Sequence, residues 1–237
     1  MTSGTLYGIG VGPGDPELLT LKAVRLIQSS PVIAYPAAEE RRSIARGIVA
    51  AYLDDRGDTH EEIALRFPLA ESAAPAQRFY DETAALLGER LRAGLDVAVL
   101  CEGDPLFYGT FMYLYTRLAP EFRVEVVPGV SSMTASAAAL GVPLAFRNDV
   151  LSVIPAGLPP EVLRARLEAA DAAVIIKVGR YLEPVREVLH SLGLHDRARY
   201  IAHATTEAQT VIPLDEVDPA SVPYFSMIVV PSDWRPA

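Results

Sequence analysis

The stretch LYGIGVGPGDP, Leu6 to Pro16, joins a short apolar run to alternating glycines and ends in Gly-Asp-Pro. A second stretch, VAVLCEGDP, Val97 to Pro105, ends in the same tripeptide. In each, the apolar run is typical of a buried parallel strand, and the glycines allow backbone torsions and close approaches that side chains forbid. Asp suits a helix cap and Pro the first helical turn. Two such turns at one sheet edge would form a ligand cleft.

The spacing of the first glycine stretch excludes two common cofactor loops. Its glycines alternate with Ile9, Val11 and Pro13, which fits neither Gly-x-Gly-x-x-Gly nor the phosphate-binding loop. The next apolar run ends in Tyr35-Pro36 rather than in the acid that holds the ribose of a dinucleotide. A phosphorylated cofactor is therefore disfavoured. The alternative that Asp15 and Pro16 merely start a helix stays open.

The composition is that of an ordinary soluble globular protein of one large or two modest domains. The chain has 237 residues, of which 50% are hydrophobic and 22% charged. No apolar run is long enough to cross a bilayer, and Met1 to Thr5 shows no basic segment or cleavage site, so we expect a cytoplasmic protein without membrane association. The lone Cys101 fits a reducing compartment, and the net charge of −9 argues against nucleic acid as a partner.

Short apolar runs alternate with helical patterns, which predicts an α/β fold. We expect an N-terminal domain with a doubly wound parallel sheet over 1–145 and a C-terminal domain with a mixed sheet over 146–237, divided somewhere within 117–149. The predicted strands are Leu6–Gly10, Val32–Tyr35, Glu62–Phe67, Val97–Cys101, Val124–Val127, Leu151–Pro155, Ala173–Val178, Ala198–Ala202, Thr210–Ile212 and Tyr224–Val230. The predicted helices are Glu17–Ser29, with Leu18, Leu21 and Val24 on one apolar stripe, and Ser43–Leu53, Ala76–Ala93, Pro160–Ala169 and Leu182–Leu192.

No catalytic side-chain pair stands out. The four histidines, His60, His190, His195 and His203, show no metal-ligand spacing, so we expect no metal site. Ser131 and Ser132 lack the Gly-x-Ser-x-Gly elbow of a serine nucleophile, and they fit helix capping or ligand contacts instead. What remains is a cleft rich in backbone donors and small hydroxyls, which suits a reactive cofactor that does the chemistry itself.

Several segments in order along the chain resemble the tetrapyrrole (corrin/porphyrin) methyltransferase family. They are GIGVGPGDP at 8–16, CEGDPLFYGTF at 101–111, VVPGVSS at 126–132, ALGVPLA at 139–145, IIKVGR at 175–180 and ATTEAQ at 204–209. The resemblance implies S-adenosylmethionine bound in a trough between two α/β domains, a tetrapyrrole substrate and a homodimer. Within the family, EGDPLFYGTFMYL at 102–114 and PYFSMIVV at 223–230 resemble the branch of cobalamin biosynthesis that methylates the meso carbon C20 of precorrin-2 or of its cobalt-loaded form.

The resemblance also implies site residues. Carried over by motif, the cofactor contacts fall on Pro13, Glu102, Gly103, Asp104, Tyr108, Ser131, Ser132, Val178, Ala204 and Thr205. Glu102 stands where many relatives have glycine, which puts a purely backbone role there in doubt. The carboxylates of a tetrapyrrole need cations, and the arginines near predicted strand ends are Arg41, Arg42, Arg46, Arg147 and Arg180. Core packing for Tyr108 and Val178, and solvated surface positions for the arginines, stay open as alternatives.

Other functions on the same fold stay open as well. A relative of this kind could methylate another tetrapyrrole position, an RNA or a protein, although an RNA substrate would call for a basic stripe. A non-catalytic tetrapyrrole-binding protein is the remaining class. A turnover assay separates it from the enzymes because a carrier transfers no methyl group.

Overall fold

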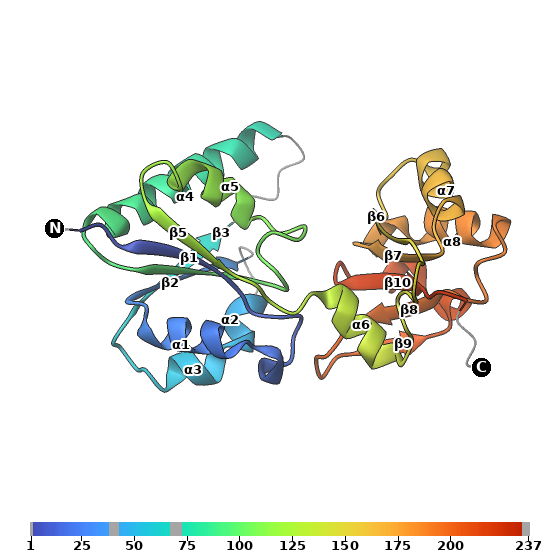
Figure 1. Ribbon diagram of the computed structural model, residues 1–237, viewed down its shortest axis with the longest axis horizontal. Coiled ribbons are helices and arrows are strands. Elements are labelled where there is room, and N and C mark those ends of the chain that lie inside the picture. The colour runs from blue at the N-terminus through green and yellow to red at the C-terminus, as the bar shows by residue number, and fades with distance from the viewer. Residues whose placement is uncertain (1, 38–42, 67–72, 234–237) are drawn as a thin grey trace. The chain divides into compact units, whose positions relative to one another are not determined.

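The computed structural model describes residues 2–37, 43–66 and 73–233, which fall into two compact units (Figure 1). The division lies between Ser131 and Ser132, earlier than the expected 145/146 boundary and inside the 117–149 range. Its physical reason is the apolar segment after Ser131. Met133, Leu140 and Leu144 pack against the core of the second unit, so this segment belongs there.

The first unit contains a five-stranded, all-parallel sheet. Its strands are β1 (Thr5–Gly10), β2 (Val32–Ala37), β3 (Glu61–Arg66), β4 (Val97–Cys101) and β5 (Arg123–Val127), in the order β3-β2-β4-β1-β5. β4 is buried along its whole length, with Val97, Val99 and Cys101 facing one core cluster and Ala98 and Leu100 facing another. This period-two alternation is what a central strand covered on both faces requires.

Helices cover both faces of this sheet. The connections from β1 through β2 to β3 contain the 3₁₀ helix η1 (Pro16–Leu18) and the helices α1 (Leu21–Ser29), α2 (Ile44–Ile48) and α3 (Ala50–Asp54). The connections from β3 through β4 to β5 contain α4 (Ala73–Arg92) and α5 (Phe111–Leu118). Figure 1 shows α1, α2 and α3 on one face and α4 and α5 on the other, and each group buries its apolar side chains in its own cluster. The predicted doubly wound parallel sheet is confirmed.

Two predicted helices are each interrupted. The helix expected over Glu17–Ser29 breaks at Leu19 and Thr20, which are extended, because the Thr20 hydroxyl accepts a hydrogen bond from the Ala23 amide at 3.1 Å and starts α1 anew. The expected apolar stripe is therefore wrong at Leu21, which is 90% exposed, and the buried face of α1 is Ala23, Leu26 and Ile27. The helix expected over Ser43–Leu53 is likewise divided at Val49 into α2 and α3.

The second unit contains a mixed five-stranded sheet, as predicted. Its strands are β6 (Leu151–Pro155), β7 (Ala172–Ile176), β8 (Arg199–Ala202), β9 (Thr210–Ile212) and β10 (Ser226–Val230), in the order β6-β7-β10-β8-β9. Only β6 and β7 pair in parallel; the other three pairings are antiparallel.

Helices also pack on both faces of the second sheet. One core cluster joins α7 (Pro160–Glu168) and α8 (Leu182–Ser191) to the sheet, and α6 (Ser132–Leu140) contributes to the cluster on the opposite face. Three short 3₁₀ helices complete the unit: η2 (Gly179–Tyr181), η3 (Leu214–Glu216) and η4 (Pro219–Ser221).

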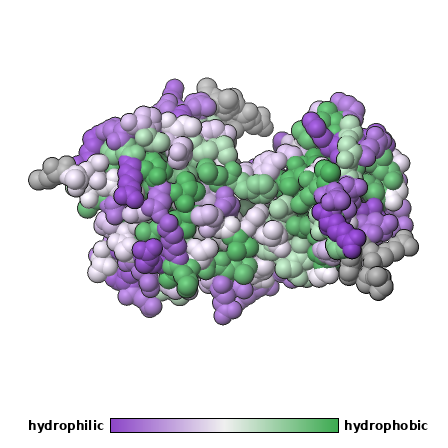
Figure 2. Space-filling model, in the orientation of Figure 1, coloured by the Kyte–Doolittle hydropathy of each residue, from purple (hydrophilic) through white to green (hydrophobic). Residues whose placement is uncertain are grey.

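The visible surface and the helices of the described residues can be compared with what a membrane-spanning helix requires. On the face drawn in Figure 2, hydrophilic and hydrophobic residues are interspersed over both units. None of the helices within the described ranges combines the length and the apolar character that a bilayer span needs. The 20-residue α4, for example, contains several charged side chains.

Three glycine-containing segments meet where β1, β4 and β5 end. Gly12 and Gly103 exchange backbone hydrogen bonds, with N···O distances of 3.3 and 2.8 Å, and the Val11 amide donates to the Cys101 carbonyl at 2.9 Å. A Cβ atom on Gly10 would lie 2.5 Å from the Gly129 nitrogen and 2.7 Å from the Gly103 oxygen. Gly103 has a φ of +65°, which side chains disfavour. We call Gly10, Gly12, Gly103 and Gly129 the glycine junction.

Gly10→Ala is expected to destabilise the first unit by about 1–3 kcal/mol or more, because the new methyl group meets backbone atoms that cannot rotate away. The measurement is the urea midpoint at unchanged m-value. Gly47→Ala is the matched control: Gly47 lies in α2, where a new methyl group would have no atom within 4 Å, so this exchange should stabilise by up to about 1 kcal/mol. Equal effects of the two exchanges would show that the junction is not tightly packed.

Candidate functional site

The topology of the first sheet indicates where a ligand would bind. We call this place, at the carboxyl ends of β1 and β4, the ligand edge. β1 and β4 are neighbours, yet the chain leaves β1 toward β2 across one face and leaves β4 toward β5 across the other. In open parallel sheets, ligands bind outside the carboxyl ends of strands at such a switch point. The segments that follow these two strand ends are the two Gly-Asp-Pro stretches. The cleft position predicted from the sequence is thus the one that the strand order favours.

The two Gly-Asp-Pro turns have the same local geometry. Asp15 Oδ1 accepts a hydrogen bond from the Glu17 amide at 2.8 Å, and Asp104 Oδ1 accepts one from the Leu106 amide at 2.9 Å. At Asp15 the turn caps η1, with Pro16 at its first position, which confirms the expected cap. The second turn does not lead straight into a helix, because α5 begins only at Phe111.

Asp104 also ties the second turn to the segment after β5. Its Oδ2 accepts a hydrogen bond from the Gly129 amide at 3.1 Å, so each carboxylate oxygen holds a different loop amide. The structure thereby brings together the predicted residues Pro13, Gly103 and Asp104 with the start of the PGVSS segment. Ser131 and Ser132 follow in that segment, and both are partly buried.

Glu102 has an environment unlike that of the other acids at this edge. Its carboxylate accepts hydrogen bonds from its own amide and from the amide of Ala45 in α2. Burial raises the pKa of Glu102 above its ordinary value, and these two hydrogen bonds only partly offset that effect. The doubt that the sequence raised about a purely backbone role is supported, because this side chain is anchored at the ligand edge.

Tyr108 lies in an exposed apolar turn between Asp104 and α5. Its φ is +55°, in the left-handed region, and its ring packs edge-on against Phe107 with the centroids 5.1 Å apart. Leu106, Phe107 and Tyr108 are each at least 38% exposed. Core packing as the explanation for Tyr108 is therefore wrong. Left-handed torsions at non-glycine residues cost energy and gather at functional sites.

A comparable edge occurs in the second unit. β7 and β8 both run antiparallel to β10, so their carboxyl ends lie at the same edge of the sheet. Lys177 and His203 follow these ends with φ of +59° and +50°, and Thr205 follows with +66°. The His203 amide donates to the Phe225 carbonyl at 2.8 Å, and the Val178 amide to the Ser226 carbonyl at 3.4 Å.

The predicted residues of the second unit lie at this edge but differ in which of their groups a ligand could contact. Val178 has a fully buried side chain in the cluster under α8, so only its backbone is available to a ligand. Ala204 is 9% exposed, and the Thr205 amide donates to the Gln209 side chain at 2.8 Å. Sequence reasoning missed Lys177 and His203, because nothing in a non-glycine residue type indicates a left-handed torsion.

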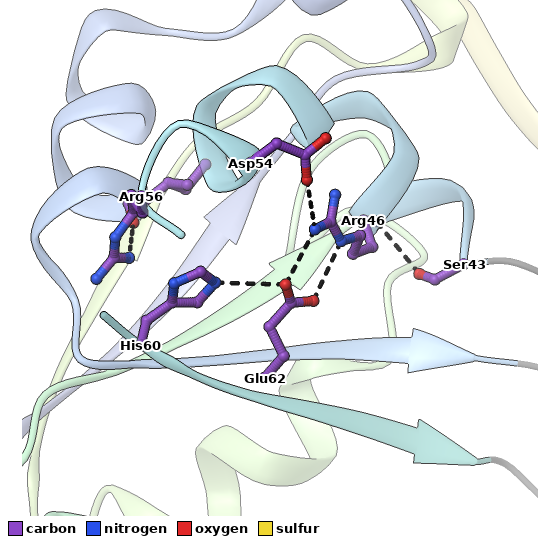
Figure 3. Close-up of polar contacts among 7 residues, drawn as sticks. Ser43, Arg46, Asp54, Arg56, His60 and Glu62 are labelled. Carbon is purple, nitrogen blue, oxygen red and sulfur yellow. Dashed lines mark hydrogen bonds and ion pairs between the residues drawn. The ribbon is translucent and has the colours of Figure 1, made fainter. Parts of the chain in front are cut away.

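Arg46 is engaged in a network within the first unit (Figure 3). Its guanidinium donates to both carboxylate oxygens of Glu62, at 3.1 and 3.0 Å, and to Asp54 at 2.8 Å. His60 Nε2 lies 3.3 Å from the same Glu62. The arginine lowers the pKa of Glu62, and the carboxylates raise that of Arg46. Arg46 holds α2 and α3 to β3, so we no longer assign it to substrate carboxylates.

The other predicted arginines differ in what the structure shows. Arg180 is exposed, donates to the Tyr181 hydroxyl at 3.0 Å and lies over that ring at 5.1 Å. Arg147 is exposed, has a φ of +49° and lies over the Phe146 ring at 5.0 Å. Arg41 and Arg42 lie outside the described residues. For these four, a role in substrate binding stays a prediction.

The described residues offer little for metal or thiol chemistry. No group of three or more His, Cys, Asp and Glu side chains within the described ranges is placed to hold a metal ion. Cys101 is buried in β4 with its thiol 3.6 Å from the Val99 carbonyl, and burial strongly raises its pKa. A thiol of that kind is a poor nucleophile. The ligand edge thus offers backbone groups, the acids and an exposed aromatic turn.

Comparison with known proteins decides the family. Residues 5–218 match the family described as tetrapyrrole (corrin/porphyrin) methylases. The chain belongs to this family. The resemblance inferred from the sequence motifs is thereby confirmed.

Three relatives are similar to this chain over nearly its whole length. It is 44% identical to the cobalamin biosynthesis protein CobIJ of Mycobacterium tuberculosis, covering 99% of this chain and 47% of the relative. The chain thus spans about half the length of that relative. It is 40% identical to a precorrin-2 C(20)-methyltransferase of Sinorhizobium, covering 98% and 96%, and 32% identical to a cobalt-precorrin-2 C(20)-methyltransferase of Salmonella typhimurium, covering 98% of each.

A solved structure shares the fold of this chain. It is the uroporphyrin-III C-methyl transferase from Thermus thermophilus complexed with S-adenyl homocysteine, at 27% identity and a TM-score of 0.68. The similarity covers 96% of this chain and 92% of that one. The predicted fold class is confirmed on this ground as well as on the strand order.

Asp104→Asn is expected to destabilise the protein by about 1–3 kcal/mol, because an amide group presents only one acceptor oxygen and leaves one loop N–H facing an NH₂ group. Urea unfolding measures the effect. Asp218→Asn is the matched control, since Asp218 forms the same turn before Pro219 with a single amide, that of Ala220 at 3.0 Å. We expect the control to stay within about 0.5 kcal/mol of the wild type. If Asp104→Asn left the stability unchanged, the hydrogen bond between Asp104 and the Gly129 amide would contribute nothing to it.

Glu102→Gln is expected to make stability less dependent on pH. The raised pKa means that the folded chain keeps a proton that the unfolded chain has lost, so the stability contributed by Glu102 falls as pH rises from the unfolded pKa through the folded one. Glutamine keeps an acceptor for the Ala45 amide but does not titrate. The variant should therefore gain stability relative to the wild type in urea titrations as the pH rises above the ordinary pKa of glutamate. Glu17→Gln, at an exposed carboxylate, should show no such trend.

Proposed function

We propose that the protein transfers a methyl group from S-adenosylmethionine to the meso carbon C20 of precorrin-2, or of its cobalt-loaded form, in cobalamin biosynthesis. The observation that carries the proposal is the 40% identity with the Sinorhizobium precorrin-2 C(20)-methyltransferase, which extends over 98% of this chain and 96% of the relative. The C20-like segments at 102–114 and 223–230 agree with it.

The glycine junction fits a methyl donor of this kind. When bound, S-adenosylmethionine supplies a positively charged sulfonium whose methyl group is open to attack by an electron-rich carbon. The backbone hydrogen bonds between Gly12 and Gly103 hold the two Gly-Asp-Pro turns side by side, and neither turn carries a phosphate-binding pattern. We retain as proposed cofactor contacts Pro13, Glu102, Gly103, Asp104, Tyr108 and Ser131 of the first unit, and Ser132, Val178, Ala204 and Thr205 of the second.

The role of the chain in this reaction is mainly positioning. A reduced tetrapyrrole has an enamine-like meso carbon, so alignment of that carbon with the methyl group supplies much of the rate. The rigid junction and the two-loop tie of Asp104 hold the turns in place. The exposed Leu106–Tyr108 turn offers an apolar surface that reduces solvation where charge is dispersed.

A homodimer in the cytoplasm completes the proposal. The resemblance to the family supports the dimer, and the single buried Cys101 agrees with a reducing compartment. Light scattering of the purified chain measures its mass. A monomer at micromolar concentration would remove the dimer from the proposal without touching the activity.

With either ring form and S-adenosylmethionine, the protein should add one methyl group at C20. Mass spectrometry and NMR of the product locate the new carbon, and activity should persist in a chelator. S-adenosylhomocysteine should raise the stability by about 2.7 kcal/mol at one hundred times its Kd. NAD and ATP are the control ligands and should give no comparable shift. Methylation at another ring carbon would overturn the C20 assignment, and no binding of S-adenosylhomocysteine at millimolar concentration would overturn the cofactor.

A further inference from the structure

Glu102 is an acid at the ligand edge with no cationic partner among the described residues. The influences on its pKa are burial, its own amide and the Ala45 amide. Arg46 follows Ala45 in α2, but its guanidinium is held by Glu62 and Asp54. Glu102 is largely buried and keeps a small exposed fraction. An ionisable carboxyl group of this kind, beside a proposed cofactor position, is a candidate for proton transfer.

The other acids at the same edge have structural tasks. Asp15 caps η1 through the Glu17 amide, and Asp104 uses one oxygen for the Leu106 amide and the other for the Gly129 amide. Both tasks depend on the carboxylate as acceptor. The hydrogen bond from the Ala45 amide does not require Glu102 to be ionised, because a protonated carboxyl group still offers its carbonyl oxygen as an acceptor. Glu102 is therefore the acid at this edge that can gain a proton and keep its anchor.

The proposed reaction leaves one proton to be removed. C20 carries a hydrogen before methylation. When C20 forms its bond to the methyl group, the carbon–sulfur bond breaks and its electron pair stays on sulfur, which becomes a neutral thioether. The ring then carries a positive charge and C20 has four single-bonded substituents. Loss of the C20 proton returns the C–H electron pair to the ring and restores conjugation, so a base must accept that proton.

We propose that the Glu102 carboxylate accepts the proton that leaves C20 after methyl transfer and then releases it to water. This inference rests on the proposed function. Its geometric basis is the place of Glu102 directly after β4 and before Gly103, with the side chain fixed at Ala45. Burial, which raises the pKa of Glu102, makes it a stronger base than an exposed glutamate.

The titratable surroundings of Glu102 are few in the described part of the chain. On its own segment, the neighbours of Glu102 are the buried Cys101 thiol and Asp104. Burial raises the pKa of Cys101, and the charges of Glu102 and Asp104 raise it further. From α2 it meets the Ala45 amide, and in β2 the Tyr35 hydroxyl is hydrogen-bonded to Glu62. The rate should therefore follow one ionisation, rising with pH as Glu102 loses its proton.

The test compares Glu102→Gln and Glu102→Asp with the wild type under single turnover, with either ring form and S-adenosylmethionine. The Gln variant should lose about a hundredfold or more in rate, as the removal of a positioned base does, and should lose the acid limb of the pH profile. The Asp variant should keep an intermediate rate with that limb present. Glu17→Gln, at an exposed carboxylate of η1, is the matched control and should keep the wild-type profile.

Two further measurements do not depend on turnover. Calorimetry should give an S-adenosylhomocysteine Kd within about threefold of the wild type for Glu102→Gln, because glutamine keeps the backbone and an acceptor oxygen for a cofactor contact and loses only the titrating group. Carboxyl ¹³C NMR of the ligand-free protein, compared with the Gln variant, should show Glu102 titrating above its ordinary value. A normal pKa, or loss of the ligand affinity along with the rate, would overturn the proton-acceptor role.

The outcomes also separate this inference from the proposed function. No methylated product from the wild type with either ring form would refute the function itself. Product formation by the wild type together with an unchanged rate and acid limb in Glu102→Gln would leave the function intact and refute the role of Glu102. A substrate deuterated at C20 should show a larger isotope effect in the Gln variant, where proton loss becomes slow.

Discussion

The close approach of three backbone segments at the ends of β1, β4 and β5 is the constraint on which the first unit depends. Gly10, Gly103 and Gly129 pack so closely that a methyl group on Gly10 would meet the other two. Because these segments follow adjacent parallel strands, their packing also fixes where the strand ends stand relative to one another. The same lack of side chains lets the two Gly-Asp-Pro turns lie side by side at the switch point. Structural and ligand-binding demands therefore select glycine for the same physical reason.

Many of the strands and turns could be predicted from the sequence because they depend on local or periodic patterns. The alternation of Val97, Val99 and Cys101 with Ala98 and Leu100 places β4 between two helical layers. Each Asp-Pro pair forms its turn locally, because the Asp carboxylate accepts a hydrogen bond from the amide two residues later. This occurs at Asp15, Asp104 and Asp218. The parallel and mixed sheets follow from such elements and their order.

What the sequence could not supply depends on which hydrogen-bond partner a residue takes, and neither periodicity nor residue type reveals that choice. Thr20 caps α1, and a periodic apolar pattern does not reveal that break, so the pattern puts Leu21 on the wrong face. Residue type and position make Arg46 a candidate for a ligand, but Glu62, sixteen residues later, holds it from β3. Lys177 and His203 have left-handed torsions at the ends of β7 and β8, beside β10, and the sequence pattern does not locate them.

The contrast between Arg46 and Glu102 shows how the first unit distributes charge. Around α2, Arg46 is neutralised by Glu62 and Asp54, so its charge is used in joining α2 and α3 to β3. At Ala45, one residue earlier, the neighbouring acid receives only an amide hydrogen bond and stays uncompensated among the described residues. Pairing Glu102 with a cation would hold it as a weakly basic carboxylate, whereas burial beside an uncharged donor strengthens it as a base. The isolation of Glu102 from its arginine neighbour is thus what equips this edge for proton transfer.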